Sequence, residues 1–244
     1  MMISSRTLGI LVGTQTVTLV LLAALVLSGF RQATTRFGEI SAERIDIVDE
    51  HGKTVLAIAN KARIAGPVVA GKAYPVALSD GREHMAGMIF FNQDGDEMGG
   101  LVFNSFRLPN GKAAGIGHLS FDRFQDNQVV ALQYKENATS VQAGLTVYDR
   151  PGTGVFATSF ALLDEARSAP PARLAEIRRQ LAELSAQGGL GAERAFLGSR
   201  DRSAQLLLKD AIGRVRARLV IDTDDAARLE FLDEAGKVTA KYPG

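Results

Sequence analysis

Hydrophobic and polar residues alternate along most of the chain, and short turns containing Asp or Asn and Gly separate the alternating segments. The pattern recurs over residues 44–60, 87–104, 204–221 and 227–242. Alternation with a period of two is typical of β-strands with one buried face. Asp or Asn at the start of a turn accepts backbone hydrogen bonds, and Gly tolerates a positive φ angle. We therefore predict serial antiparallel β-hairpins, with two more around residues 135–140 and 149–154.

Residues 168–189 interrupt the β pattern and predict an amphipathic helix at about 170–186. Prolines stand where this helix begins and glycines follow its end, as helix termini favour. The apolar residues at helical spacing, which share one face, are Leu174, Ile177, Leu181 and Leu184. Their stripe either packs on the sheet of the same domain or docks a partner or the membrane surface.

Residues 8–30 form an uncharged, largely apolar run of about 23 residues. A helix of that length is roughly 34 Å long, enough to cross a hydrocarbon core of about 30 Å. A cleaved signal peptide is the alternative, but its apolar core is only about 7–15 residues long. We therefore predict a single transmembrane helix over 8–30, after an N-terminal tail at 1–7.

The orientation of this span depends on few charges, because Arg6 precedes it and Arg31 and Arg36 follow it. These arginines leave the positive-inside count close to a tie. A short tail before an apolar run is typical of a signal anchor, which delivers the following domain outside the cytoplasm. We expect a single-pass protein of the bacterial inner membrane with a periplasmic domain.

The fold expected after the anchor is mainly β. A polar linker at 31–43 leads to a β domain at 44–163, a helical insertion at 164–191, and C-terminal hairpins of the same domain at 192–244. The remaining length is sufficient for one large core or two small ones.

Charge and cysteine content exclude several classes of function. The chain has 28 Lys+Arg and 27 Asp+Glu, and removing the three arginines of the first 38 residues leaves 25 against 27. Such a nearly neutral domain lacks the concentrated basic face that nucleic acids require. Because the chain has no cysteine, it has no disulfide, thiolate nucleophile or cysteine metal site.

Motifs of known chemistry are missing from the sequence. There is no P-loop, no dinucleotide-binding fingerprint and no nucleophile elbow. The histidines His51, His84 and His118 have no spacing that would place them on one helix face. The string at 92–97 resembles a calcium loop but is better explained as a turn between strands. We predict no catalytic residue, no cofactor and no metal site.

Two segments remain as candidates for binding. Residues 61–84 form a long stretch without sustained periodicity, which indicates either a functional loop or a hidden short strand. In the hairpin of residues 215–233, the alternation sets Leu219 opposite Leu229 and Arg218 opposite Glu230. Arg214 and Arg216 then have no obvious partner, and they either meet lipid phosphates or an acidic surface, or lie on a solvated face.

The segments ERIDIVDEHGKTVLAIANKARIAGPVVAGK and AGMIFFNQDGDEMGGLVFN carry a resemblance. They resemble a group of bacterial proteins that combine a short N-terminal anchor with a domain of D-x-x-G hairpins. The similarity covers roughly residues 39–150, including DRFQDNQVVALQY and GLTVYDRP, and fades over the helix and the last hairpins. It implies bacterial origin and an anchored β architecture, and no activity, cofactor or catalytic residue.

These observations favour a non-catalytic, membrane-anchored accessory or scaffolding subunit of a larger membrane complex, for example a photosynthetic or respiratory one. Its partners are then the bilayer, through residues 8–30, and that complex. One alternative is an envelope module that binds or senses a ligand, with residues 61–84 as its site. A second alternative is a hydrolase whose site assembles from dispersed Asp, His and Ser residues.

Overall fold

The computed structural model describes residues 9, 13–23, 36–79, 81–152 and 154–243. It contains two compact units, residues 1–41 and residues 42–244. In the first unit, residue 9 and residues 13–23 are helical, and the other positions of the predicted span 8–30 lie outside the described residues. Within the described part of the chain, no helix combines the length and the apolar character needed to cross a membrane.

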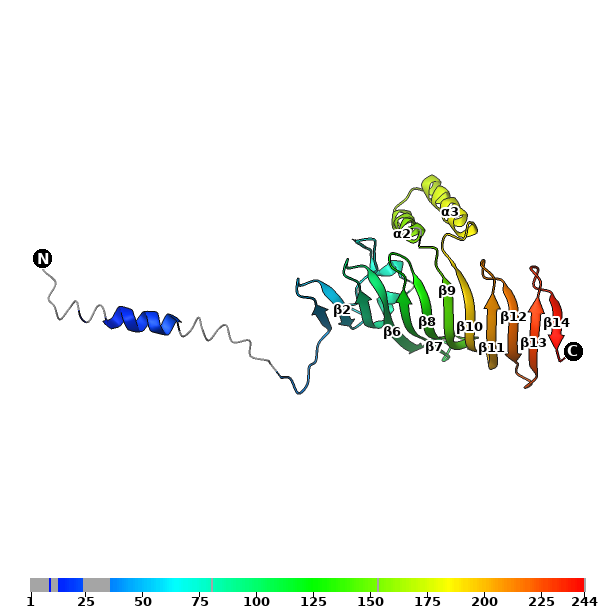
Figure 1. Ribbon diagram of the computed structural model, residues 1–244, viewed down its shortest axis with the longest axis horizontal. Helices are drawn as coiled ribbons and strands as arrows, with labels where there is room; N and C mark the ends of the chain where they lie inside the picture. The colour runs from blue at the N-terminus through cyan, green and yellow to red at the C-terminus, as the bar shows by residue number, and fades with distance from the viewer. Residues whose placement is uncertain (1–8, 10–12, 24–35, 80, 153, 244) are drawn as a thin grey trace. The chain divides into compact units, whose positions relative to one another are not determined.

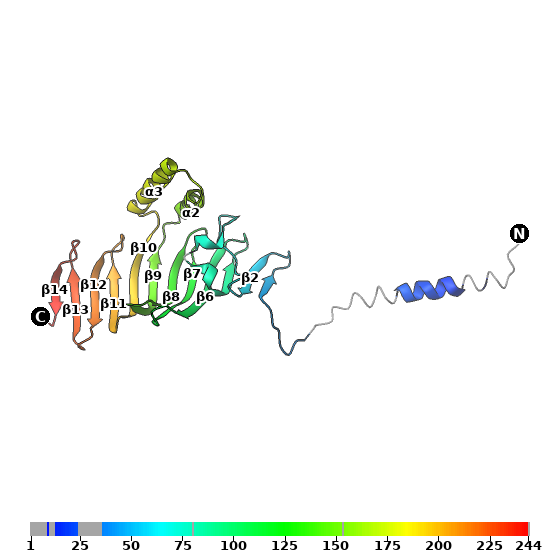
Figure 2. The same cartoon turned by 180° about the vertical axis from the view of Figure 1, so that it is seen from behind.

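The second unit is built on a 12-stranded antiparallel sheet in which each strand pairs with the next along the sequence (Figures 1 and 2). The predicted mainly β fold of serial antiparallel hairpins is therefore confirmed. Its strands are β1 (Arg44–Val48), β2 (Thr54–Ala59), β5 (Ala86–Phe91), β6 (Glu97–Arg107), β7 (Ala113–Asp122), β8 (Gln128–Glu136), β9 (Val141–Asp149), β10 (Ala192–Arg200), β11 (Ser203–Lys209), β12 (Val215–Ile221), β13 (Ala227–Leu232) and β14 (Val238–Tyr242). Two shorter strands, β3 (Val68–Val69) and β4 (Lys72–Ala73), form a separate ribbon.

Four of the hairpins close with the same turn chemistry. In each, a side-chain oxygen of the first turn residue accepts the backbone N–H groups two and four positions further on. These residues are Asp49, Asn92, Asp210 and Asp233. The glycine three positions on has a φ angle between 79° and 88°, a conformation that side chains disfavour. The repeated Asp/Asn-x-x-Gly signal therefore fixes where each strand reverses.

The connection between β9 and β10 contains two helices, α2 (Val155–Ala166) and α3 (Pro171–Ala186). The helix predicted at about 170–186 is confirmed by α3. The hairpin predicted around 149–154 is wrong, because the chain enters α2 there. Gly154, whose φ of 75° is left-handed, is the N-cap residue of this helix. Within α2, the ring of Phe156 packs edge-on against that of Phe160, with centroids 4.9 Å apart. The apolar residues of this segment therefore pack as part of a helix and not as part of a strand.

Helix α3, which carries the apolar stripe, packs against α2. Ile177 is fully buried, whereas Leu174, Leu181 and Leu184 are half-buried. We expect Ile177→Ala to lower the free energy of unfolding by about 2 kcal/mol, because it leaves a cavity between two helices. Leu181→Ala, at a partly exposed position, should cost less. Urea denaturation checks this order, and equal small losses would indicate that the stripe serves docking.

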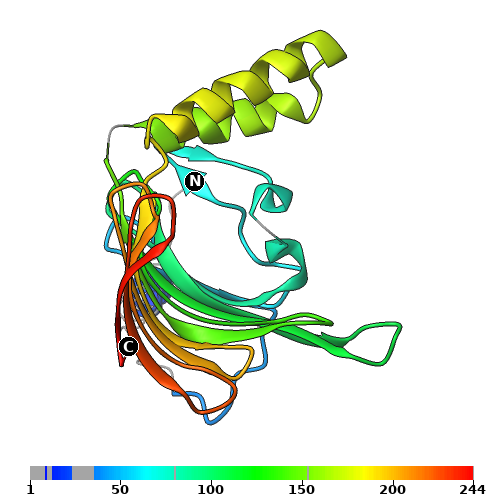
Figure 3. The ribbon, with the colours of Figure 1, turned by 90° about the vertical axis from the view of Figure 1, so that its right-hand side faces the viewer.

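The sheet has two contrasting faces. Residues 61–84 and the helices lie on one side, and the strands curve around that side (Figure 3). We call this the covered face. It holds the buried strand residues Ala57, Ile89, Val102, Ser120, Ala131, Thr146, Phe196, Leu207 and Glu230. Because side chains alternate along a strand, the neighbours of these residues in sequence point to the opposite side, which we call the open face.

Two rows of apolar residues cross the open face in register. The central row takes one residue from each of the 12 strands: Ile45, Ile58, Met88, Leu101, Leu119, Leu132, Leu145, Leu197, Leu206, Leu219, Leu229 and Tyr242. The flanking row lies beside it: Ile47, Leu56, Phe90, Gly99, Phe121, Val130, Val147, Ala195, Leu208, Ala217, Phe231 and Ala240. Neither row contains a charged or strongly polar side chain.

Candidate functional site

A cavity of about 370 Å³ lies between the covered face and the segment of residues 61–84. This volume falls within the range of about 300–1,000 Å³ typical of small-molecule sites. Strands β5 to β8 form its floor, and α2 contributes Phe156 and Phe160 to its wall. Its principal polar lining residues are Arg82, Asp96, Glu97, His118, Ser120, Asp122, Asp126, Gln128, Gln133 and Lys135.

The 61–84 segment is fixed over the sheet by contacts in its middle and near its C-terminal end. The backbone N–H of Gly71 donates to Oδ1 of Asp96 at 2.6 Å. The ring of Tyr74 meets that of Phe160 on α2 in an edge-on contact, with centroids 5.4 Å apart. The segment holds the hidden short strand β3 and also forms a wall of the cavity.

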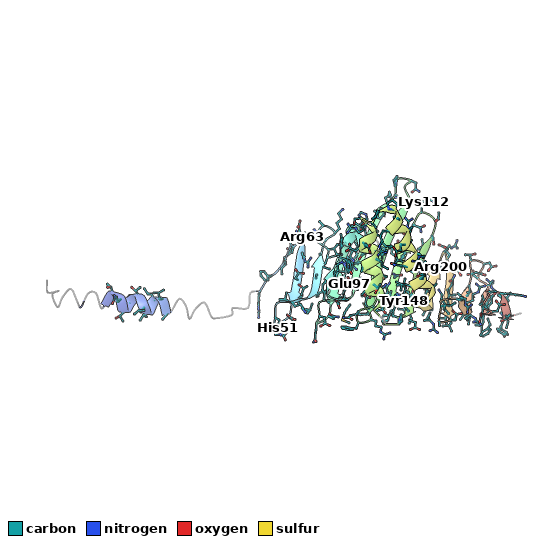
Figure 4. All side chains as sticks on the ribbon, turned by 90° about the horizontal axis from the view of Figure 1, so that it is seen from above. His51, Arg63, Glu97, Lys112, Tyr148 and Arg200 are labelled. Carbon is teal, nitrogen blue, oxygen red and sulfur yellow. The ribbon has the colours of Figure 1, made fainter. Side chains whose placement is uncertain are left out.

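A buried ion pair holds the C-terminal end of this segment. The guanidinium of Arg82, in the 3-10 turn η2 (Arg82–His84), donates to both carboxylate oxygens of Glu97 at 2.8 and 2.5 Å. The two side chains are only 14% and 12% exposed. Glu97 begins strand β6 and can be found by its label in Figure 4. Bidentate geometry of this kind holds the segment to the sheet with a defined orientation.

Strand β7 supplies the chemistry of the floor. His118, Ser120 and Asp122 lie two residues apart, so all three point toward the covered face. Sheet register then brings Gln133 of β8 opposite His118 and Gln128 opposite Asp122. The sequence HLSFD therefore places an imidazole, a hydroxyl and a carboxyl in one line along the cavity.

The Asp122 carboxyl is strongly perturbed. Burial, and after it the negative charge of Glu97, raise its pKa to about 7, although Arg82, Arg150 and a hydrogen bond with Ser120 oppose the shift. Its Oδ1 atom is buried and has no hydrogen-bond partner in the described part of the protein. Near neutral pH, this group exists as a mixture of the acid and the carboxylate.

His118 is shifted in the opposite sense. Burial lowers its pKa to about 4, and the positive charges of Lys135 and Arg82 contribute to the shift. The amide nitrogen of Gln133 contacts its Nδ1 atom. Since the amide nitrogen donates, Nδ1 accepts, and the ring of a neutral His118 carries its proton on Nε2. His118 is therefore a neutral hydrogen-bond donor.

The acidic lining outweighs the basic lining. Asp96, Glu97, Asp122 and Asp126 oppose Arg82 and Lys135 around the cavity. Asp96 is 1% exposed. Its Oδ1 accepts a hydrogen bond from the backbone N–H of Gly71, whereas its Oδ2 has no hydrogen-bond partner among the residues described. The cavity thus has excess negative charge and two buried carboxylate oxygens that lack a donor. Such oxygens cost free energy unless a donor reaches them.

The predicted contact residues of the C-terminal hairpins lie far along the sheet from this cavity. The register expected for this hairpin is confirmed, with Leu219 opposite Leu229 and Arg218 opposite Glu230. Arg214 and Arg216 have partners that the sequence did not show. Arg214 pairs with Asp210 at 2.7 Å, and the side chain of Arg216 donates to the carbonyl of Leu232 at 3.0 Å.

Among the residues that the structure describes, no group of three or more His, Asp or Glu side chains could hold a metal ion. His51, His84 and His118 lie on different elements, a turn, η2 and β7. Of the three, His118 is the one that lines the cavity.

Comparison with known protein families finds no family model that matches the chain. Comparison with curated proteins finds no significantly similar sequence. The functional assignment therefore depends on the geometry of the site.

Proposed function

We propose that the chain is a binding module for a small cationic amine with an apolar body, held in the cavity beneath residues 61–84. The observation that carries this proposal is the buried, unpartnered Oδ1 atom of Asp122 in a cavity large enough for a small molecule. An ammonium group donates to such an oxygen and balances its charge.

The surroundings of Asp122 support a cation over an anion. Arg82 and Glu97 neutralise each other, and the remaining charged lining residues are three acidic side chains, Asp96, Asp122 and Asp126, and the basic Lys135. Phe156, Phe160 and Val102 supply apolar surface for the body of the ligand. Neutral His118 adds a hydrogen-bond donor without adding charge.

Binding fits the geometry better than hydrolysis. A hydrolase of the Ser-His type needs the hydroxyl within hydrogen-bond reach of the imidazole. Ser120 instead bonds with Asp122, and Nδ1 of His118 contacts Gln133.

Matched probes test the proposal. We expect benzylamine to bind the full chain in mild detergent, and benzyl alcohol, which shares its ring but lacks its charge, to bind more weakly. Since the pKa of Asp122 is about 7, raising the pH from 5.5 to 8 increases its ionised fraction, and the amine affinity, roughly thirtyfold. Isothermal titration calorimetry measures both.

The control variants separate the site from the rest of the chain. Asp122→Asn should remove the pH dependence and most of the amine affinity, whereas Asp94→Asn, in the exposed β5–β6 turn, should change neither. Equal amine binding by wild type and Asp122→Asn would contradict the proposal, as would a preference for the alcohol.

A second candidate function is that of an accessory subunit in a larger membrane assembly. The uncharged apolar run at 8–30 favours it, because such a run before a folded domain is typical of a signal anchor. We propose that this run spans the bacterial inner membrane and that the domain faces the periplasm. A periplasm-specific reporter fused after Gly244 tests the topology, and recovery of a stoichiometric partner in mild detergent tests the assembly.

A further inference from the structure

We propose that the open face of the sheet is the interface of a homodimer, covered by the open face of a second copy of this chain. This inference is independent of the cavity, which lies on the opposite face.

The open face is continuous and apolar across the whole sheet. The central and flanking rows each run through all 12 strands, and every step between neighbouring strands is a paired position. Large side chains in these rows are exposed to solvent, for example Leu132 at 55% and Leu197 at 58%. By contrast, the covered face carries the charged residues Lys135, Arg218 and Glu230.

The area of this face exceeds what a monomer normally exposes. Twelve strands spaced about 4.8 Å apart, with residues of one face about 7 Å apart along each strand, give two rows an area of roughly 700–800 Å². The largest apolar patch on a typical monomer is about 300–600 Å². A stable interface buries about 800 Å² on each partner. The two rows therefore provide close to one full dimer interface.

The chemistry of the face selects a second copy as its occupant. Neither row carries a charge, and the one hydroxyl group, that of Tyr242, lies at the end of the central row, so the face offers little that would specify a different protein surface. Twisted sheets pack face to face at about 10 Å, and a two-fold axis lets a row of Leu residues meet the same row of the partner. Surfaces that bind bilayers combine apolar residues with Lys or Arg, which these rows lack.

The oligomeric state of the full chain in mild detergent tests the proposal. We expect a protein mass of about twice 26.1 kDa by light scattering. Leu132→Asp with Leu197→Asp should raise the dissociation constant by roughly a hundredfold or more, because two charges per copy would be buried without partners. Ile212→Asp is the matched control: its side chain is 64% exposed and lies in the β11–β12 turn, outside both rows.

Cysteine cross-linking provides a second measurement, which tests the interface even if the Asp variants do not fold. The chain has no native cysteine, so each introduced thiol reports on one position. Leu132→Cys and Leu145→Cys, on the two middle strands of the sheet, should cross-link to the same residue of the second copy through a short bismaleimide. Ile212→Cys should not. A monomeric wild type, or the absence of cross-linked dimer at both middle positions, would overturn the proposal.

Discussion

Replacing Asp122 with Asn is expected to raise the free energy of unfolding by about 4 kcal/mol above pH 7. The pKa of this carboxyl is about 7 in the folded protein, against 3.8 for an unperturbed Asp. Between these values the unfolded chain has released a proton that the folded chain retains. The wild type therefore loses stability as the pH rises through this window, and Asn, which never ionises, does not.

The difference between variant and wild type should consequently depend on pH. Below pH 3.8, Asp122 is protonated in both the folded and the unfolded wild type. Its ionisation then makes little difference between the free energies of unfolding of the wild type and the variant. The difference should grow by about 1.4 kcal/mol per pH unit and level off near pH 7. Urea denaturation at pH 4, 5.5 and 8 measures it, and a difference that stays constant with pH would contradict the assignment.

His118 contributes a slope of the opposite sign. Its pKa is lowered to about 4 in the folded protein, so acidification below 6.5 protonates the unfolded chain first and removes stability. Between pH 4 and 6.5 the effects of Asp122 and His118 oppose each other in the wild type. Asp122→Asn should therefore show stability that rises with pH over this range, and His118→Gln should show the reverse.

Arg82→Met should lower the free energy of unfolding by about 3–5 kcal/mol, because it leaves the buried carboxylate of Glu97 without a counter-charge. The double variant Arg82→Met with Glu97→Gln should recover most of this loss, since no buried charge remains unpaired. Loss of the ion pair in Arg82→Met should also loosen the attachment of residues 61–84 to the sheet. Hydrogen exchange would detect this as faster exchange of the backbone amides of that segment.

An exposed pair provides the control for this cycle. Arg179 and Glu183 on α3 contact each other at 2.8 Å, but their side chains are 63% and 53% exposed. Arg179→Met should therefore cost less than about 1 kcal/mol. If the single Arg82 variant is no less stable than the Arg179 variant, the ion pair does not hold the segment.

The hairpins could be predicted from the sequence because each one is encoded locally. Asp49 or Asn92 followed by Gly fixes a turn, and the alternation on each side fixes two strands and their register. Helix α2 was missed because its segment has no capping side chain at its start and contains the strand-favouring residues Val155 and Phe156. It packs against Tyr74, which is distant in sequence, and against α3, and such contacts are not visible in the local sequence pattern.

The cavity could not be predicted for a related reason. His118, Ser120 and Asp122 read as an ordinary alternating strand, and their pKa shifts arise only when residues 61–84 fold over them. The alternation also gave no indication of which face is enclosed. Leu219 and Ile221 would be expected in a core, yet they lie on the open face, while Arg218 lies on the covered face beside Glu230.

The sequential strand order has a consequence for folding. Every strand from β1 to β9, apart from the β3–β4 ribbon, can pair with its predecessor as soon as it is synthesised, and the same holds from β10 to β14. The pairing of β5 with β2 must wait for residues 60–85, and the pairing of β10 with β9 must wait for the longer connection that contains the two helices. Closing that longer loop adds little entropy cost, because the cost grows only with the logarithm of loop length. We therefore expect two ribbons that form hairpin by hairpin at the ribosome and join last at β9 and β10, with fast kinetics for a sheet of this size.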